Sequence, residues 1–205
     1  MADKTSRRFL SSPLVVKLGG SLCQYVPELV TVFRASARPL VIVPGGGPLA
    51  NAVRKVRTND DSAHWMAVAA MDQYGWYISS WGIGTTTCLR VPDRHVVFLP
   101  YCSMRQRDPL PHSWDVTSDS IAAWVANALG LDLLVLKSVD GIFEMGSLMN
   151  RLTTSTDTDV VDPFFIPFIL GKKVTTTIIN GTSPDRVARF LKGDVVLGTR
   201  IDTTF

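Results

Sequence analysis

Short apolar runs alternate with longer stretches of helical periodicity along this chain. Six runs rich in Val, Ile and Leu are each bounded by Gly, Pro or polar residues, which is typical of buried strands. The predicted strands open the segment Leu14–Ser21 and occupy 40–43, 95–99, 133–136, 175–179 and 195–201. Apolar residues spaced by three or four positions, behind Pro, Ser, Thr or Asp, predict helices between them. The predicted helices begin at Pro27, Pro48, Ser62, Thr117, Asp162 and Ser183, and the helix from Pro48 is expected to end at Arg57.

The order of these elements predicts an α/β fold. A strand, a helix and a second strand follow one another between residues 14 and 43, and parallel strands need a crossover of this kind. The sheet is therefore expected to be parallel at its centre. The chain of 205 residues is long enough to bury one large core, and we expect a single domain over 1–205 with a loose tail over 1–12. Residues 101–115 are predicted to form a long loop, and 144–159 an exposed hairpin or loop.

The segment Lys17-Leu-Gly-Gly-Ser follows the first strand directly. Gly19 and Gly20 allow the backbone to approach a ligand and to point N–H groups at an anion. Ser21 adds a hydroxyl donor, and Lys17 supplies a positive charge where phosphoryl oxygens would gather. The alternative is a buried strand that enters a tight turn, with its lysine reaching solvent. The segment is neither a standard P-loop nor a Rossmann fingerprint, and by itself it leaves both interpretations open.

A second glycine run favours the ligand site. Gly45, Gly46 and Gly47 follow the second strand, and Pro48 is placed as one of the first residues of a helix. Three consecutive glycines cost conformational entropy on folding, and packing alone does not explain them. Both glycine runs lie at the carboxyl ends of parallel strands, where ligands of open α/β sheets bind. The turn Lys137–Gly141 and the helix start at Thr117 are expected at the same edge.

Composition and charge exclude several classes of function. The net charge is +3 and no long basic run occurs, so nucleic acid is not an expected partner. No apolar run approaches the ~20 residues of a membrane span, and no signal peptide is evident. Three cysteines lack metal-type spacing and suit a reducing compartment. We therefore expect a cytoplasmic protein without membrane partners.

The predicted helix at 62–80 is rich in aromatic residues. Its expected stripe, predicted to form core or an oligomer contact, is Trp65, Met66, Ala69, Ala70, Gln73, Trp76 and Tyr77. Together with Trp81, these tryptophans predict a homo-oligomer. His64 in the same helix is predicted to be a surface or cap residue.

Five ordered motifs resemble the amino acid kinase superfamily, which includes carbamate, acetylglutamate, aspartate and uridylate kinases. The motifs are Val16–Ser21, Pro44–Pro48, Val116–Ala123, Lys137–Ile142 and Ile178–Gly181, and the closing Leu191–Gly193 and Gly198–Ile201 fit as well. The resemblance covers nearly the whole chain. It implies a three-layer α/β/α sandwich with a mainly parallel central sheet, and an ATP-dependent kinase. Mg²⁺ is expected from the chemistry of phosphoryl transfer.

The resemblance also implies roles for individual residues. It makes Lys17 a catalytic lysine that stabilises the transferring phosphoryl group, and Asp119 the carboxylate that orients catalytic lysines. The residues assigned to the nucleotide are Lys17, Gly19, Gly20, Ser21, Lys137, Asp140 and Gly141. Gly45–Gly47 would cradle the acceptor. Larger members carry a second catalytic lysine before the Asn-Gly strand, and the corresponding segment Asp162–Lys173 lacks that motif.

The short chain and the segment Leu110–Asp119 are similar to a small branch, the aminomethylfuran-phosphate kinase-like proteins of methanofuran and methylofuran biosynthesis. That resemblance implies transfer to the phosphomonoester of an aminomethylfuran, giving a diphosphate. Asp115 could pair with the ammonium group of this acceptor, and Trp114 could cover its flat ring. For Asp115 the alternative is a second charge at the helix start.

Two other functions stay open at the level of sequence. One is a kinase of the carboxylate or carbamate type, which makes an acyl phosphate. The other is a nucleotide- or oxyanion-binding protein on the same fold without turnover. The absence of a second lysine motif favours the binding protein, whereas the presence of both Lys17 and Asp119 favours a kinase.

Overall fold

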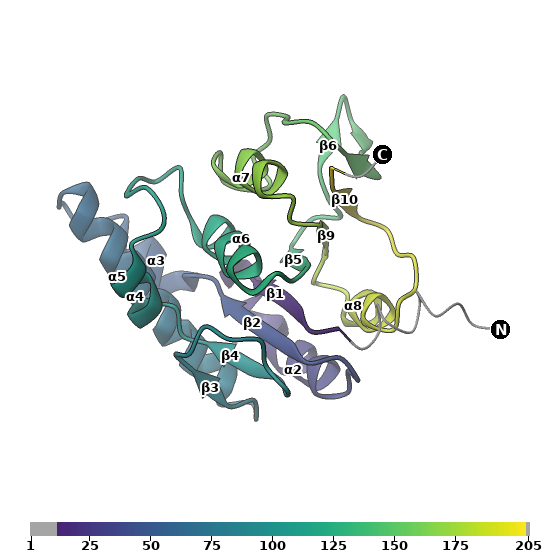
Figure 1. Ribbon diagram of the computed structural model, residues 1–205, viewed down its shortest axis with the longest axis horizontal. Helices are drawn as coiled ribbons and strands as arrows, with labels where there is room; N and C mark the ends of the chain where they lie inside the picture. Colours follow the sequence, from purple (N-terminus) through teal and green to yellow (C-terminus); the bar gives the residue numbers. More distant parts are fainter. Residues whose placement is uncertain (1–11, 204–205) are drawn as a thin grey trace.

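The computed structural model describes residues 12–203 and has the predicted α/β architecture (Figure 1). The strands are β1 (Leu14–Leu18), β2 (Leu40–Pro44), β3 (Thr85–Thr86), β4 (Val96–Phe98), β5 (Leu133–Lys137), β6 (Phe143–Glu144), β7 (Ser147–Leu148), β8 (Arg151–Leu152), β9 (Thr176–Asn180) and β10 (Thr199–Ile201). The helices are the 3₁₀ helix η1 (Gly20–Tyr25), α2 (Val26–Arg34), α3 (Gly47–Val53), α4 (Asp60–Ser79), α5 (Tyr101–Arg107), α6 (Ser118–Leu129), α7 (Phe165–Lys172) and α8 (Pro184–Leu191).

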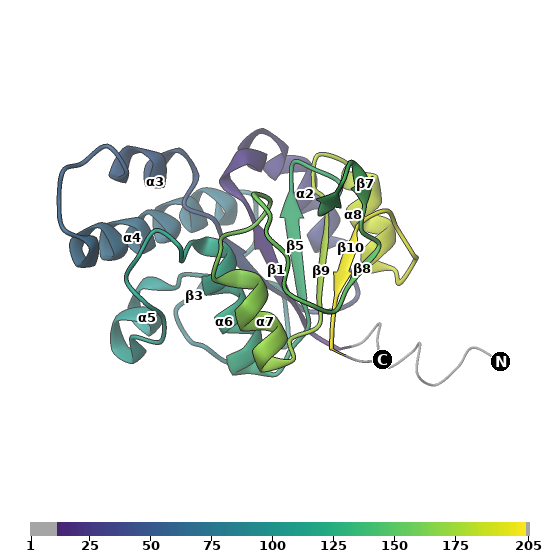
Figure 2. The same ribbon diagram turned by 90° about the horizontal axis from the view of Figure 1, so that it is seen from above.

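The central sheet of the described chain has the strand order β3-β4-β2-β1-β5-β9-β10-β8. Every neighbouring pair is parallel except β9 with β10, which is antiparallel. The strand β1 lies between β2 and β5, so its carboxyl end opens at the middle of the sheet (Figure 2). The predicted three-layer sandwich with a mainly parallel sheet is confirmed.

Alternating residues of the central strands pack into two apolar layers. Val15, Val43 and Val135 face α6 and α7, whereas Val16 and Leu134 face α2 and α8. This alternation is the two-residue period of a strand that is covered on both faces. Lys17 follows Val16, and it therefore lies on the face that α6 covers.

The helix α4 occupies the predicted segment but buries a different set of side chains. Its buried residues are Ala63, His64, Val68, Ala70, Met71, Tyr74, Gly75 and Ile78. Of the predicted stripe, Ala70 is buried and Trp65 packs against the core while partly buried. Trp76 is 59% exposed, and Met66 and Tyr77 are also exposed, because the two core layers contact α4 along Val68 and Met71 on one side and Tyr74 and Ile78 on the other. A homo-oligomeric contact through the exposed aromatic residues stays a prediction.

Two further predictions need correction. Part of the predicted loop 101–115 is the helix α5, which Pro100 caps and which ends at Asp108 in the left-handed region (φ 43°). The helix α3 ends at Val53 instead of reaching residue 57. The segment 144–159, predicted as an exposed hairpin or loop, begins with the hairpin of β6 and β7, but its strand β8 joins the central sheet and Leu152 there is buried. The predicted tail lies outside the described residues except for Ser12. Within residues 12–203, no helix has the length and apolar character needed to cross a membrane.

Candidate active site

Two lysines from neighbouring strands point to the same side of the sheet. In the parallel pair of β1 and β5, Lys17 lies opposite Val135, and Lys137 follows Val135 by two residues. Because side chains alternate along a strand, Lys17, Val135 and Lys137 share one face. The two strands end at the middle of the sheet, so both ammonium groups reach the edge where the chain leaves it.

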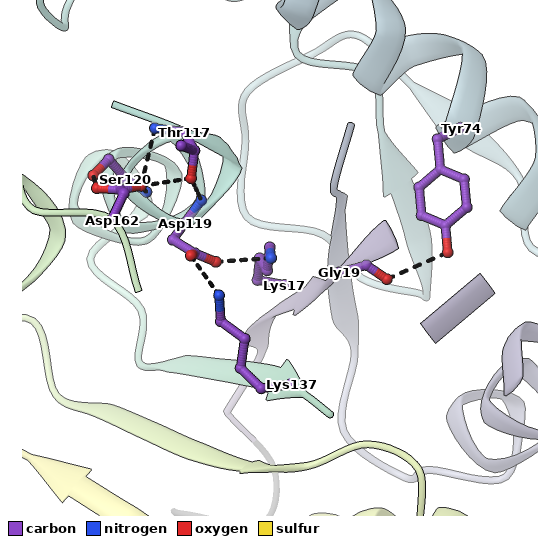
Figure 3. A network of polar contacts seen from close by, with 8 residues as sticks. All are labelled: Lys17, Gly19, Tyr74, Thr117, Asp119, Ser120, Lys137 and Asp162. Atoms are coloured by element: carbon purple, nitrogen blue, oxygen red, sulfur yellow. Dashed lines mark hydrogen bonds and ion pairs between the residues drawn. The ribbon is translucent and has the colours of Figure 1, made fainter. Parts of the chain in front are cut away.

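Asp119 joins these two lysines (Figure 3). Its Oδ1 lies 2.7 Å from the Nζ of Lys17, and its Oδ2 lies 2.6 Å from the Nζ of Lys137. Asp119 is the second residue of α6, a helix that Thr117 caps at its start and Gly130 ends in the left-handed conformation, as the sequence predicts. We call Lys17, Asp119 and Lys137 the lysine clamp.

The lysine clamp is buried and carries a net positive charge. The side chains of Lys17 and Asp119 are each only 5% exposed. Burial by itself would raise the pKa of Asp119, but the ammonium groups of Lys17 and then Lys137 outweigh it and hold that pKa below its usual value. Burial, and next the charge of Lys17, lower the pKa of Lys137, which Asp119 partly opposes. The clamp therefore holds an ionised carboxylate under two cationic groups, an arrangement suited to phosphoryl oxygens.

The two glycine runs lie against each other beside the clamp. A Cβ atom on Gly20 would stand 2.1 Å from the Cα of Gly47, and one on Gly45 would stand 2.9 Å from the nitrogen of Gly20. Gly47 also has a positive φ of 58°, which favours glycine. These contacts explain both runs by close backbone approach. Tyr74 of α4 supports them, since its hydroxyl donates a hydrogen bond to the carbonyl of Gly19 at 3.4 Å.

A cavity of about 400 Å³ opens from the lysine clamp. Its clamp end is lined by Lys17, Asp119, Lys137, Gly20 and Ser21, and its far end by Arg54, Asp60, His64 and Trp114. The walls between the two ends include Val68, Met71, Val116 and Ile121 of α4, α6 and the loop before α6. A small ligand could therefore touch the clamp with one end while the rest occupies a mixed apolar and polar chamber.

Aromatic rings and charges meet at the far end. The guanidinium of Arg54 lies 4.1 Å from the ring centroid of Trp114, a cation–π contact. The ring of His64 stacks on that of His112 with centroids 4.2 Å apart. His112 is held between the carboxylates of Asp61 and Asp108, each at 2.8 Å.

His64 differs from its prediction as a surface or cap residue, because it is 7% exposed. Its helix places it on the buried side, where burial and the neighbouring His112 lower the pKa of His64 to about 4. His64 is therefore a neutral ring in the cavity wall at neutral pH. The pKa of His112 is raised instead, first by its hydrogen bond to Asp61.

The other predicted site residues differ in whether they line the cavity. Gly46, Gly47 and Trp114 line it, whereas Asp115 is exposed and is not among the lining residues. Asp140 lies beyond the clamp and pairs with Arg186 of α8 at 2.5 Å. Gly141 has a φ of 156°, and a Cβ there would stand 2.5 Å from the hydroxyl of Thr199. The sequence interpretation missed Arg54, Asp60, His64 and Tyr74, which carry no motif.

One curated protein is similar to the chain over most of its length. The chain is 27% identical over 208 residues to [5-(aminomethyl)furan-3-yl]methyl phosphate kinase from Methanocaldococcus jannaschii, and the match covers 91% of this chain and 96% of that protein. No protein-family model matches the chain.

Solved kinase structures share the fold. Uridylate kinase from Archaeoglobus fulgidus matches 93% of this chain and 99% of its own with a TM-score of 0.68 at 19% identity. An isopentenyl phosphate kinase matches 92% of this chain and 100% of its own with a TM-score of 0.64 at 16% identity. UMP kinase from Ureaplasma parvum matches 94% and 99% with a TM-score of 0.67 at 14% identity.

The fold and the similar sequence together confirm the resemblance to the amino acid kinase superfamily. The structures, at these identities, establish the fold. The sequence relative is itself a kinase, and it supports the prediction of an ATP-dependent kinase.

Proposed function

We propose that this protein transfers the γ-phosphoryl group of ATP to the phosphomonoester of an aminomethylfuran and so forms a diphosphate. The observation that carries the proposal is the lysine clamp at one end of a cavity of about 400 Å³. The similar kinase named for [5-(aminomethyl)furan-3-yl]methyl phosphate supports this acceptor, and with it a role in methanofuran or methylofuran biosynthesis in the cytoplasm.

The proposed chemistry needs no general base. An anionic oxygen of the acceptor phosphate forms a bond to the γ-phosphorus while the bond from that phosphorus to the β,γ-bridging oxygen breaks, and ADP leaves. Negative charge gathers on the transferring group and on the bridging oxygen. Lys17 would stabilise the transferring group, Lys137 would lie against the nucleotide phosphates, and Asp119 would keep both ammonium groups in place. Preorganised charges of this kind supply most of the catalysis in phosphoryl transfer.

The nucleotide is proposed to lie over the first glycine run. The N–H groups of Gly19 and Gly20 and the hydroxyl of Ser21 would bind phosphates, and the turn with Asp140 and Gly141 would run along the nucleotide. Within residues 12–203, no group of three or more acidic, histidine or cysteine side chains is arranged so that it could hold a metal ion. Mg²⁺ is instead expected to arrive on the phosphates of ATP, which supply most of its ligands in kinases.

The acceptor is proposed to fill the cavity between the glycine run Gly45–Gly47 and the far end. Its phosphate would lie by the clamp and its ring by Trp114. Two carboxylates are candidates for its ammonium group, Asp115 from the sequence and Asp60 from the cavity wall. Asp60 fits better, because it lines the cavity and Asp115 does not.

The proposed pairing of Asp60 with the ammonium group of the acceptor can be tested by comparing one variant of Asp60 with one of Asp115. We expect Asp60→Asn to raise the KM for the acceptor about 10- to 100-fold, since a charge-assisted bond is worth about 1.5–3 kcal/mol, with little change in the KM for ATP. Asp115→Asn is the matched control, since Asp115 is an exposed carboxylate in the loop before α6. Steady-state kinetics with both substrates varied would measure the effect. An increase in KM with Asp115→Asn alone would move the ammonium site to the helix entry.

The proposed function is tested by ADP release in the presence of Mg²⁺ and ATP. The acceptor panel is aminomethylfuranmethyl phosphate, UMP, carbamate, aspartate and acetylglutamate. Turnover with the furan phosphate alone is the expected result, with the diphosphate product identified by mass. Turnover with carbamate, aspartate or acetylglutamate would support the acyl-phosphate alternative instead. Tight ATP binding without turnover of any acceptor would point to the binding protein.

A further inference from the structure

Asp162 lies in the segment that leads into α7, forty-three residues after the clamp carboxylate Asp119. It is 8% exposed. Its Oδ2 accepts hydrogen bonds from the backbone N–H of Thr117 at 2.9 Å, the hydroxyl of Thr117 at 2.7 Å and the backbone N–H of Ser120 at 3.1 Å (Figure 3). Its Oδ1 accepts from the hydroxyl of Ser120. Both oxygens therefore bind one short stretch of chain.

That stretch is the cap and first turn of α6, the turn that carries Asp119. The first N–H groups of a helix have no partner within the helix. The hydroxyl of Thr117, the cap residue, accepts only a long bond of 3.4 Å from the N–H of Asp119. Asp162 accepts the hydrogen bonds of the Ser120 N–H and of the Thr117 hydroxyl. The carboxylate thus acts as a cap supplied from a remote part of the sequence.

A second contact joins the same two segments. The N–H of Phe164 donates to the carbonyl of Asp115 at 3.2 Å, so the entry to α7 is fastened to the loop before α6 on both sides of Thr117. Asp119 lies between the two residues that Asp162 binds. Asp162 therefore holds the chain on both sides of the residue that pairs with Lys17 and Lys137.

We infer that Asp162 is a positioning residue of the kinase reaction, which fixes the first turn of α6 so that Asp119 bridges Lys17 and Lys137 before substrates bind. This inference rests on the proposed function. Asp162 touches neither the transferring group nor the lysine nitrogens by a hydrogen bond, so it acts through Asp119. It also acts on the clamp by charge, because its negative charge raises the pKa of Lys137, against burial and the charge of Lys17, which lower it, and alongside Asp119.

The test is Asp162→Asn, which keeps the shape but removes the charge and one acceptor oxygen. We expect kcat to fall about 10- to 100-fold, as for other small misplacements of catalytic groups, with the KM values for ATP and acceptor within about threefold of wild type. The alkaline limb of the kcat profile should move to lower pH, because Lys137 loses a charge that favours its protonated form. Asp159→Asn, an exposed carboxylate of the same segment, is the control and should match wild type.

A second variant covers the case in which Asp162→Asn does not fold. Ser120→Ala removes one hydroxyl donor to Asp162 and keeps the charge, so we expect a smaller fall in kcat, roughly threefold to tenfold, with the alkaline limb unmoved. Wild-type kcat in each of these variants that folds, with only a lower Tm, would overturn the inference and leave Asp162 a purely structural cap.

A readout without turnover separates this inference from the proposed function. The ¹³Cε chemical shift of Lys137, assigned by its loss in Lys137→Arg, reports the ionisation of Lys137 in the folded protein. A lower midpoint in Asp162→Asn supports the coupling of Asp162 to the clamp even if the wild-type protein turns over none of the acceptors. An unchanged midpoint together with an unchanged kcat contradicts it.

Discussion

Lys17→Ala is expected to lower kcat by about 10³-fold or more, because a buried cation on the transferring phosphoryl group supplies electrostatic stabilisation of that size. The Nζ of Lys17 lies 2.7 Å from Asp119, and the residue is 4% exposed on the central strand β1. Water cannot replace the lost charge in such a site as it would at a surface. Coupled ADP release with the furan phosphate would measure the loss.

The Lys17 variant should stay folded, because Asp119 retains Lys137 as a partner at 2.6 Å. A far-UV CD spectrum and a melting curve would verify this. Lys192→Ala provides the matched control, since Lys192 is an exposed lysine at the end of α8, and its kcat should equal that of wild type. Turnover by Lys17→Ala within about tenfold of wild type would contradict a role in the chemical step.

The central strands could be predicted from the sequence because each is an apolar run that ends at glycine or a polar turn. The strands β1, β2, β5 and β9 lie within one residue of their predicted positions. The helix α6 could be predicted from its own caps, Thr117 and Gly130. The strands β3 and β8 have two residues each, and such short strands are defined by pairing with a neighbour and not by their own pattern.

The predictions for the segments of α5 and α4 differ from the structure for two different physical reasons. The helix α5 lacks a side-chain cap and carries Arg105 and Arg107 in its last turn, so its sequence is similar to that of a polar loop. The helix α4 contacts both core layers, so its apolar residues do not form a single stripe and its periodicity cannot tell which residues are exposed. Tertiary packing decided the orientation of α4.

The candidate site was predictable where a residue stands in a motif and unpredictable where strand register brings residues together. Lys17 and Asp119 were predicted from the motifs. The pairing of Lys137 with Asp119 depends on the register of β5 beside β1, which periodicity does not give. Asp162 reaches the first turn of α6 only through the packing of α7 against α6. A role for Lys137 as the second catalytic lysine is therefore a prediction that comes from the structure and not from a motif.

Lys137→Ala tests whether this residue is the second lysine. We expect kcat to fall about 10²- to 10³-fold, a loss typical of one preorganised charge in a catalytic site, together with a higher KM for ATP. The competing location is the end of α7, where Lys172 is exposed. Lys172→Ala should therefore retain wild-type kinetics. A large loss in Lys172→Ala and none in Lys137→Ala would return the second lysine to the segment before β9.

If Lys137 takes part in catalysis, its ionisation should make kcat depend on pH. Burial and the charge of Lys17 lower the pKa of Lys137 from the usual 10.5. Below that lowered pKa the residue is protonated and can neutralise phosphate charge, so wild-type kcat should fall as pH rises through a midpoint below 10.5. In Lys137→Arg the guanidinium stays charged at every accessible pH. That variant should be less active because its geometry differs, but it should lack the alkaline limb, and an unchanged limb would assign it to a group other than Lys137.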